Sequence, residues 1–326
     1  MKKIRVAIIG AGLIGKKRAE AIKKISEYSL VYIYDINKKA ADDFSKLYDC
    51  QVVKNLNDIL NDKTIDLVII AIRHKDAAIL TPRVLERKNV LLEKPLGRNF
   101  IEAQKIIDAA KKYNRMLSVG FSFRCYPHIQ LALIYLKNEK LGKIISSTFN
   151  IGHSAHPGYD KTWKMDKDLC GGGVILDPGI HMIDLMLTLI GKPQKQHVYT
   201  SSKGWNSKVE DEAFMIFEYA NKSISSHHYS LNFSKNTFFI EIVGTKGTLR
   251  LEGRAGNYGD MTFSFTPKWF WLNKKEIVIE NYGEEDESFF EELKELATKI
   301  NKKNLINNYS EYLDSMKILD ALYEKL

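Results

Sequence analysis

Several features are scarce in this chain of 326 residues, and each scarcity excludes a class of protein. Only three residues are cysteines, an odd number without paired spacing, which indicates neither a disulfide framework nor a zinc knuckle. Seven prolines beside 20 glycines exclude collagen-like and low-complexity architectures. The longest strongly apolar stretch in the middle of the chain, residues 174–190, contains two aspartates and a histidine. We therefore expect no membrane span.

Charge of one sign is not concentrated in any segment. The chain has 49 basic and 40 acidic residues, a net charge of +9, but its lysines are scattered among acidic residues and asparagines. No long basic run with interleaved aromatics is found, so we expect no nucleic-acid partner. The apolar run at the start is split by Arg5 and is followed by no small-residue cleavage site, which argues against a signal peptide. We expect a cytoplasmic protein.

Apolar and aromatic residues are plentiful, at 44% hydrophobic with 15 Phe, 16 Tyr and 4 Trp, which is enough for two ordinary domains. In the first 120 residues, short β-branched runs alternate with helical patterns, as βαβ units do. The runs are continuously apolar, so both faces of their sheet must be covered. We predict a doubly wound parallel Rossmann sheet with strands at 4–9, 30–34, 67–72, 90–92 and 116–119, and helices at 13–25, 38–47, 76–87 and 99–113.

The pattern of alternating strands and helices ends after residue 120. A helix is predicted at 127–137 and a strand at 143–151, and from about residue 198 strand patterns alternate with turns. Two amphipathic helices, 288–300 and 311–326, close the chain, the first with a capping box of Ser288 and Glu291. The fold class is therefore α/β, with a Rossmann domain at 1–122 and an α/β domain with an open, mainly antiparallel sheet at 123–326.

A glycine-rich turn carries the strongest local signal. Gly10-x-Gly12-x-x-Gly15 follows a strand pattern and opens a helix pattern, where the three glycines permit a tight turn, close approach of a pyrophosphate, and close packing of helix on strand. Asp35 ends the next strand, 20 residues after Gly15, where a carboxylate can bind the adenosine ribose and repel a 2′-phosphate. The alternative is a structural turn without ligand. NAD is preferred, and two lysines shortly after Asp35 leave NADP as a second choice.

Glu93-Lys94-Pro95 stands at the carboxyl end of the fifth strand pattern, where ligands bind in open α/β sheets. The Lys94 ammonium can hydrogen-bond a substrate hydroxyl and stabilise negative charge as its proton leaves. The alternative reading is a turn lysine before a proline that sets the loop.

A third group of polar residues interrupts an apolar helical pattern. The spacing of Asp177, His181 and Asp184 predicts that all three share one helix face, where an acid can orient and support a histidine base. As alternatives, Asp177 can cap a helix whose first residue is proline, and His181 can be a hydrogen-bonded core residue. A metal held by these residues with His153 or His156 is the competing use. No known metal spacing is present, and we predict no metal.

These motifs together resemble the Gfo/Idh/MocA family of NAD(P)-dependent sugar oxidoreductases over essentially the whole chain. The resemblance rests on the order and spacing of five signatures: Gly10 to Gly15, Glu93-Lys94-Pro95, Gly120-Phe121 leading to Arg124 and Pro127, Trp163 with Asp166, and Asp177-x-Gly179-x-His181-x-x-Asp184.

The resemblance implies a Rossmann domain and a second domain whose open sheet often forms an oligomer interface, hence a homodimer or homotetramer. It implies that Lys94 lies beside the nicotinamide, that His181 accepts the proton, and that Asp177 supports both. The implied reaction is hydride transfer between NAD, or NADP, and a secondary alcohol or ketone of a sugar, nucleotide sugar or cyclic polyol. The alternatives are a catalytically silent dinucleotide-binding regulatory protein and an NAD-dependent glycosidase.

Two sets of site residues follow. We expect the cofactor to contact Gly10, Gly12, Leu13, Ile14, Gly15, Asp35, Ile36, Ala71, Ile72, Arg73, Glu93 and Lys94. In the loop around Arg73 the chain lacks the Pro-Asn that many relatives carry. We expect the substrate to contact Lys94, Arg124, Tyr126, His153, Tyr159, Trp163, Lys164, Asp177 and His181. An arginine-lysine pair in this set would suit a carboxylate or phosphate.

Overall fold

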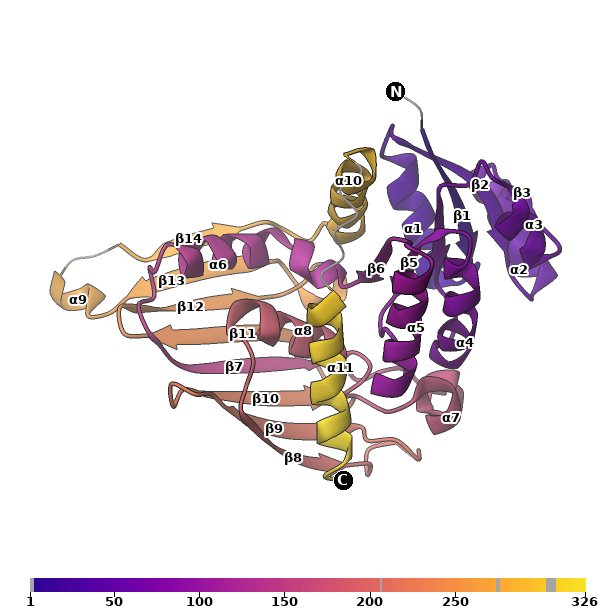
Figure 1. Cartoon of the computed structure of the whole chain (residues 1–326). Coiled ribbons are helices and arrows are strands. Elements are labelled where there is room, and N and C mark those ends of the chain that lie inside the picture. Colours follow the sequence, from indigo (N-terminus) through magenta and orange to yellow (C-terminus); the bar gives the residue numbers. More distant parts are fainter. Residues whose placement is uncertain (1–2, 206, 274–275, 303–308) are drawn as a thin grey trace. The chain divides into compact units, whose positions relative to one another are not determined.

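A computed structural model of the chain describes residues 3–205, 207–273, 276–302 and 309–326 (Figure 1). The chain forms two compact units. The first comprises Met1–Ser122 with Glu287–Met316, and the second comprises Phe123–Asp286 with Lys317–Leu326. The return of 287–316 to the first unit differs from the sequence division, which assigns everything after residue 122 to the second domain.

The first unit is built on a six-stranded sheet in the order β3-β2-β1-β4-β5-β6, with every neighbouring pair parallel. This is the Rossmann strand order, and the predicted doubly wound sheet is confirmed. The strands are β1 (Ile4–Ile9), β2 (Tyr28–Tyr34), β3 (Gln51–Val52), β4 (Leu67–Ile70), β5 (Asn89–Glu93) and β6 (Leu117–Gly120). The helices are α1 (Leu13–Lys23), α2 (Lys38–Tyr48), α3 (Leu56–Asn61), α4 (His74–Leu85) and α5 (Phe100–Lys112).

Burial explains why the central strands read as unbroken apolar runs. All four residues of β4 are fully buried, as are the middle residues of β5, because helices cover both faces of a parallel sheet. The sequence did not predict β3 and α3. With two and six residues, these elements are too short to show a periodic pattern.

Helix α10 (Ser288–Asn301) completes this unit from the far end of the chain. Its Leu293, Leu296 and Ala297 are buried in the same apolar cluster as α1 and β1. The Tyr28 hydroxyl donates a 2.8 Å hydrogen bond to the Leu293 carbonyl. The amphipathic pattern predicts helix α10, but not that it packs against α1.

The second unit is built on an eight-stranded sheet in the order β14-β13-β12-β11-β7-β10-β9-β8. Only β7 and β10 pair in parallel, so the predicted mainly antiparallel sheet is confirmed. The strands are β7 (Ile144–Gly152), β8 (Lys195–Ser201), β9 (Glu212–Glu218), β10 (Ile224–Ser230), β11 (Thr237–Gly244), β12 (Gly247–Glu252), β13 (Thr262–Pro267) and β14 (Val278–Asn281). The helices are η1 (Ser122–Cys125), α6 (Pro127–Lys137), η2 (Tyr159–Lys161), η3 (Trp163–Met165), α7 (Lys167–Cys170), α8 (Gly179–Leu189), η4 (Gly256–Tyr258), α9 (Phe270–Asn273) and α11 (Tyr309–Tyr323), whose last residues belong to this unit.

One face of this sheet is covered and the other is open. Helices α6 and α8 pack on it, and alternate residues of β9 such as Met215 and Phe217 are buried. The intervening Phe214 and Ile216 are exposed, as the two-residue period of a strand dictates. None of the helices in the described ranges has the length and apolar character needed to cross a membrane.

Candidate dinucleotide and substrate sites

The glycine loop between β1 and α1 shows a separate reason for each glycine. Gly10 has φ +110°, and a Cβ there would lie 2.2 Å from the Ala71 carbonyl oxygen. A Cβ on Gly15 would lie 2.0 Å from the Gly10 carbonyl oxygen, so α1 packs directly on the loop. Gly12 is different, because no heavy atom lies within 4 Å of its Cβ position. Open space at the middle glycine is what close approach of a pyrophosphate requires.

The start of α1 is suited to an anion. In any helix the N–H groups of the first turn, here including those of Leu13 and Ile14, have no acceptor within the helix. Gly12 is the N-cap of α1 and has no side chain that could accept from them. Such groups, at the positive end of the helix dipole, bind phosphate. Leu13 and Ile36 are 72% and 82% exposed, an unusual exposure for apolar side chains beside a polar turn.

Asp35 is anchored where β2 ends. One carboxylate oxygen accepts a 2.8 Å hydrogen bond from the Ala11 N–H, and the other accepts a 2.7 Å bond from the Asn37 N–H. The carboxylate is thus tied to the glycine loop itself. These groups fit a dinucleotide: donors for its phosphates, space for its backbone contact, and an acid in position for a ribose diol.

Three predicted cofactor contacts, Ala71, Ile72 and Arg73, lie in the turn after β4. Ile72 Cγ2 would be 3.0 Å from a Cβ on Gly10, which brings this turn against the glycine loop. Arg73 forms an ion pair with Asp76, at 2.7 Å, within the first turn of α4. Much of the Arg73 charge is therefore already compensated.

Glu93, the first residue of the Glu-Lys-Pro motif, belongs to a buried charge cluster that the sequence analysis missed. Arg18 is completely buried, and its Nε donates to Glu93 at 2.6 Å. Its Nη1 lies 2.5 Å from Glu292 of α10, and the Phe289 ring lies against the guanidinium. Burial raises the pKa of Glu292 to about 7, against the opposing charge of Arg18. One signal was available: Arg18 occupies an apolar-face position of the predicted helix, four residues after Ile14.

Lys94 follows β5 directly and is partly buried, at the carboxyl end of the sheet as predicted. The Lys94–Pro95 peptide bond is cis. Lys94 belongs to the first unit and His181 to the second, so their convergence on one substrate atom stays a prediction.

The predicted helix face of Asp177, His181 and Asp184 is wrong in one respect. Helix α8 begins at Gly179 with Pro178 as its N-cap, and the Asp177–Pro178 bond is cis. Asp177 therefore precedes the helix, in the turn that leads into it. A period of 3.6 residues does not show where the helix begins, and the proline here ends the turn rather than starting the helix.

Asp177 has a cation as its partner. Its carboxylate is buried and lies 2.8 Å from the Lys164 ammonium. The negative charge of Asp177 raises the pKa of Lys164 above its usual value. The ion pair fixes the Asp177 carboxylate at the entrance to α8.

His181 and Asp184, on α8, contact two consecutive residues of η1. The His181 ring stacks on Phe123, with centroids 3.8 Å apart and planes 8° apart. Arg124 donates two hydrogen bonds to the Asp184 carboxylate, at 2.8 and 2.6 Å. The Arg124 charge, predicted to face the substrate, is thus compensated within the protein.

His153 and Tyr159 lie near the Lys164–Asp177 pair. Burial lowers the pKa of His153, and the charge of Lys164 lowers it further. Its Nδ1 accepts a hydrogen bond from the Ala155 N–H at 2.9 Å, so the neutral ring carries its proton on Nε2. Tyr159 packs edge-on against His153, and burial raises its pKa to about 12. The structure thus brings four predicted substrate residues of the second unit into one cluster.

Tyr126 and Trp163 are the remaining predicted substrate contacts. Tyr126 is buried at the start of α6 and packs against Phe123, with ring centroids 5.2 Å apart. Trp163 is partly buried in η3, one residue before Lys164. Across the described ranges, no group of three or more histidine, cysteine, aspartate or glutamate residues is arranged to hold a metal ion.

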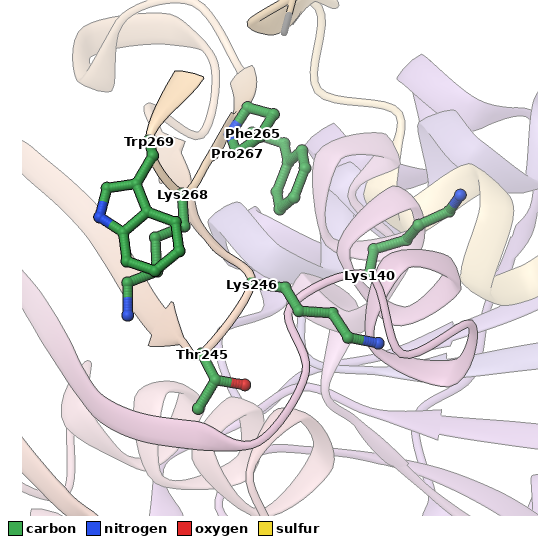
Figure 2. A pocket seen from close by; sticks show the side chains of 7 residues that line it. All are labelled: Lys140, Thr245, Lys246, Phe265, Pro267, Lys268 and Trp269. Atoms are coloured by element: carbon green, nitrogen blue, oxygen red, sulfur yellow. The ribbon is translucent and has the colours of Figure 1, made fainter. Parts of the chain in front are cut away.

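One surface pocket of about 400 Å³ lies elsewhere in the second unit, where β12 and β13 meet their turns. Figure 2 shows the Trp269 ring beside the Lys268 side chain on one wall, with the Lys268 ammonium 4.8 Å from the ring centre. Its lining contains none of the residues expected to bind cofactor or substrate: Lys140, Thr245, Lys246, Phe265, Pro267, Lys268 and Trp269. It is not a candidate for the reaction site.

Known proteins are similar to this chain over most of its length. Glucose-6-phosphate 3-dehydrogenase of Bacillus subtilis is 28% identical over 251 residues, covering 76% of this chain and 68% of the relative. Levoglucosan dehydrogenase of Pseudarthrobacter phenanthrenivorans is 25% identical over 286 residues, covering 76% and 73%. A solved levoglucosan dehydrogenase in complex with NADH and L-sorbose has the same fold, with a TM-score of 0.86 at 21% identity, covering 100% of this chain and 97% of that one.

Family models account for both units. Residues 4–121 match the NAD-binding Rossmann fold of the oxidoreductase family, and residues 135–326 match its C-terminal alpha/beta domain. The glycine loop and Asp35 agree with the first match, and the open mixed sheet agrees with the second. The chain therefore belongs to the Gfo/Idh/MocA family and is an NAD-binding oxidoreductase.

Proposed function

We propose that this protein transfers a hydride between NAD(H) and a secondary alcohol, or the matching ketone, of a sugar, nucleotide sugar or cyclic polyol. In this proposal residues 1–122 bind the dinucleotide and residues 123–326 bind substrate and form the oligomer. The observation that carries it is the open space at the Gly12 Cβ position, together with the Asp35 carboxylate, which is hydrogen-bonded to the Ala11 N–H of the same loop. Membership of the family and the sugar dehydrogenases among the relatives support the substrate class.

The bound nicotinamide supplies the hydride acceptor, and the protein supplies alignment and proton transfer. His181 accepts the hydroxyl proton during oxidation, with its ring plane held by the stacked Phe123. Lys94 donates a hydrogen bond to the same oxygen and stabilises its developing negative charge. Asp177, whose carboxylate is paired with Lys164, supports both residues.

We also propose that the open sheet face forms a homodimer or homotetramer in the cytoplasm. Tyr199 of β8 pairs with Phe214 of β9, and both are exposed. Ile216 of β9 and Ile224 of the neighbouring β10 are also exposed, and Ile279 is exposed on β14 at the other edge of the sheet. Exposed apolar side chains grouped on neighbouring strands are typical of an interface between protein chains.

The proposal is tested by a panel of sugars, polyols and uronates assayed by NADH absorbance, with NAD and NADP in parallel. Lys94→Ala and His181→Ala are each expected to lower turnover by about two orders of magnitude, a usual acid-base contribution, while NADH affinity stays near normal. An equal loss of NADH affinity in both variants would contradict these roles. Binding of NADH without turnover of any substrate would indicate a regulatory protein instead, and bond cleavage without net NADH would indicate a glycosidase.

A further inference from the structure

Arg254 lies in a tight turn that immediately follows β12. Its neighbours Gly253 and Ala255 both have φ +70°. Ala255 combines this with ψ 167°, a conformation that is unfavourable for any residue other than glycine. Hydrogen bonds from the Gly253 N–H to the Phe238 carbonyl and from the Ala255 N–H to the Gly259 carbonyl, both 3.0 Å, hold the turn. The surrounding structure therefore enforces the direction in which Arg254 leaves the backbone.

The side chain of Arg254 is enclosed by aromatic rings rather than by acids. Its guanidinium carbon lies 3.8 Å from the ring centre of Tyr258 and 5.1 Å from that of Phe123. The hydroxyls of Tyr126 and Tyr258 are the polar side-chain groups that interact with it. Its Nε is buried and has no hydrogen-bond acceptor among the described residues.

This environment distinguishes Arg254 from five other arginines of the described chain. No carboxylate forms an ion pair with it within the ranges that the structure covers, although an arginine stays charged at any physiological pH. Five other arginines each have a carboxylate partner: Arg18, Arg73, Arg98, Arg124 and Arg250. A partly buried, permanently charged group with an unsatisfied donor is costly unless an anion completes its surroundings.

Arg254 also lies among the candidate substrate residues of the second unit. Phe123, which it contacts, carries the stacked His181 on its ring. The charge of Arg254 contributes, after burial and Lys164, to lowering the pKa of His153. Lys164, the other cation beside His153, is already paired with Asp177. The cation of this cluster whose charge is not compensated by a carboxylate in the described structure is Arg254.

We propose that Arg254 binds an oxyanion carried by the substrate, so that the enzyme acts on a phosphorylated or carboxylated sugar in preference to its neutral counterpart. This inference rests on the proposed function. A guanidinium presents parallel N–H donors that match phosphate and carboxylate oxygens. Stacking on the Tyr258 ring occupies one face of the guanidinium and leaves its N–H edges for hydrogen bonds, some of which the Tyr126 and Tyr258 hydroxyls accept. The arginine-lysine pair that the sequence suggested for this role, Arg124 with Lys164, is instead engaged with Asp184 and Asp177.

The test compares matched sugars in the wild type, Arg254→Gln and Arg254→Lys. Glucose 6-phosphate, glucuronate and glucose are titrated calorimetrically into the NADH-loaded protein, and kcat/KM is measured for each with NAD. We expect the wild type to favour at least one anionic sugar over glucose by tenfold or more. Arg254→Gln removes this preference while changing the glucose values less than threefold, and Arg254→Lys restores part of it. The anion with the larger loss distinguishes phosphate from carboxylate.

Two controls make the result specific. Arg87→Gln removes an exposed arginine of the first unit, whose Nη1 bonds only to the Asn61 amide oxygen in the described structure, and should leave all ratios unchanged. Cooperative thermal unfolding within a few degrees of wild type shows that Arg254→Gln is folded. A wild type that binds glucose as tightly as both anionic sugars, or a variant that loses both classes equally, would overturn the inference. Anion binding that depends on Arg254 without turnover would support it while refuting the proposed hydride transfer.

Discussion

Replacing Gly12 by alanine tests the cofactor site without disturbing the fold. The residue has φ −74° and ψ −171°, an extended conformation that alanine adopts readily, and no heavy atom lies within 4 Å of the new methyl group. The free energy of unfolding without cofactor should therefore change by less than about 1 kcal/mol, with a small gain from the less flexible unfolded chain.

The effect on NADH binding should be much larger. If the pyrophosphate contacts the backbone here, the methyl group displaces it from the N–H groups at the start of α1. Losing one hydrogen bond to a charged group costs about 1.5–3 kcal/mol, which corresponds to roughly a 10- to 150-fold higher Kd. Fluorescence titration with NADH measures the affinity, and thermal unfolding of the cofactor-free protein measures stability.

Gly15→Ala is the matched control with the opposite pattern. Its methyl group would lie 2.0 Å from the Gly10 carbonyl oxygen, so the helix must move. Overpacking of this kind costs about 1–3 kcal/mol or more of stability. A Gly12→Ala protein that binds NADH within twofold of wild type would refute the placement of the pyrophosphate. A Gly15→Ala protein as stable as wild type would refute the close packing of α1 on the loop.

Two further predictions concern cofactor choice and acid stability. Asp35→Ser removes the carboxylate that faces a 2′-phosphate, so the ratio of kcat/KM for NADP to that for NAD should rise about tenfold or more; an unchanged ratio would exclude Asp35 from cofactor selection. His227 is buried between the Ser225 and Tyr229 hydroxyls, and burial lowers its pKa to about 3. Below pH 6.5 the unfolded state binds a proton that the native state does not, so this residue reduces stability as pH falls, by about 1.4 kcal/mol per pH unit down to pH 3. Urea unfolding at pH 7 and pH 5 should show a pH dependence about 2 kcal/mol smaller in His227→Gln than in wild type, and equal dependences would mean that His227 is not held neutral.

Much of the Rossmann unit could be predicted because its signals are local. Unbroken apolar runs separated by helical patterns indicate buried parallel strands, and the glycine spacing indicates the dinucleotide turn. The predicted positions of Lys94 and Asp35 at strand ends agree with the structure. Short elements such as β3 escaped prediction, since two residues show no periodicity.

The candidate substrate region was harder, because its key relations join residues far apart in the chain. Arg124 pairs with Asp184 across 60 positions. Arg254 reaches Phe123 from the turn after β12, the sixth strand of its sheet in chain order, and no local pattern marks it as different from the exposed Arg250 on β12. These long-range contacts decide which cations form an ion pair with a carboxylate and which do not.

The order of residues therefore sufficed for strand and helix content, for the cofactor turn and for the residue types that carry the chemistry, because periodicity and backbone freedom are properties of neighbouring residues. Folding in three dimensions settled the return of α10 to the first unit, the burial of Arg18 between two glutamates, and the pairing of Lys164 with Asp177. Electrostatic pairing and burial depend on distance in space, and distance in space is established only when segments remote in sequence pack together.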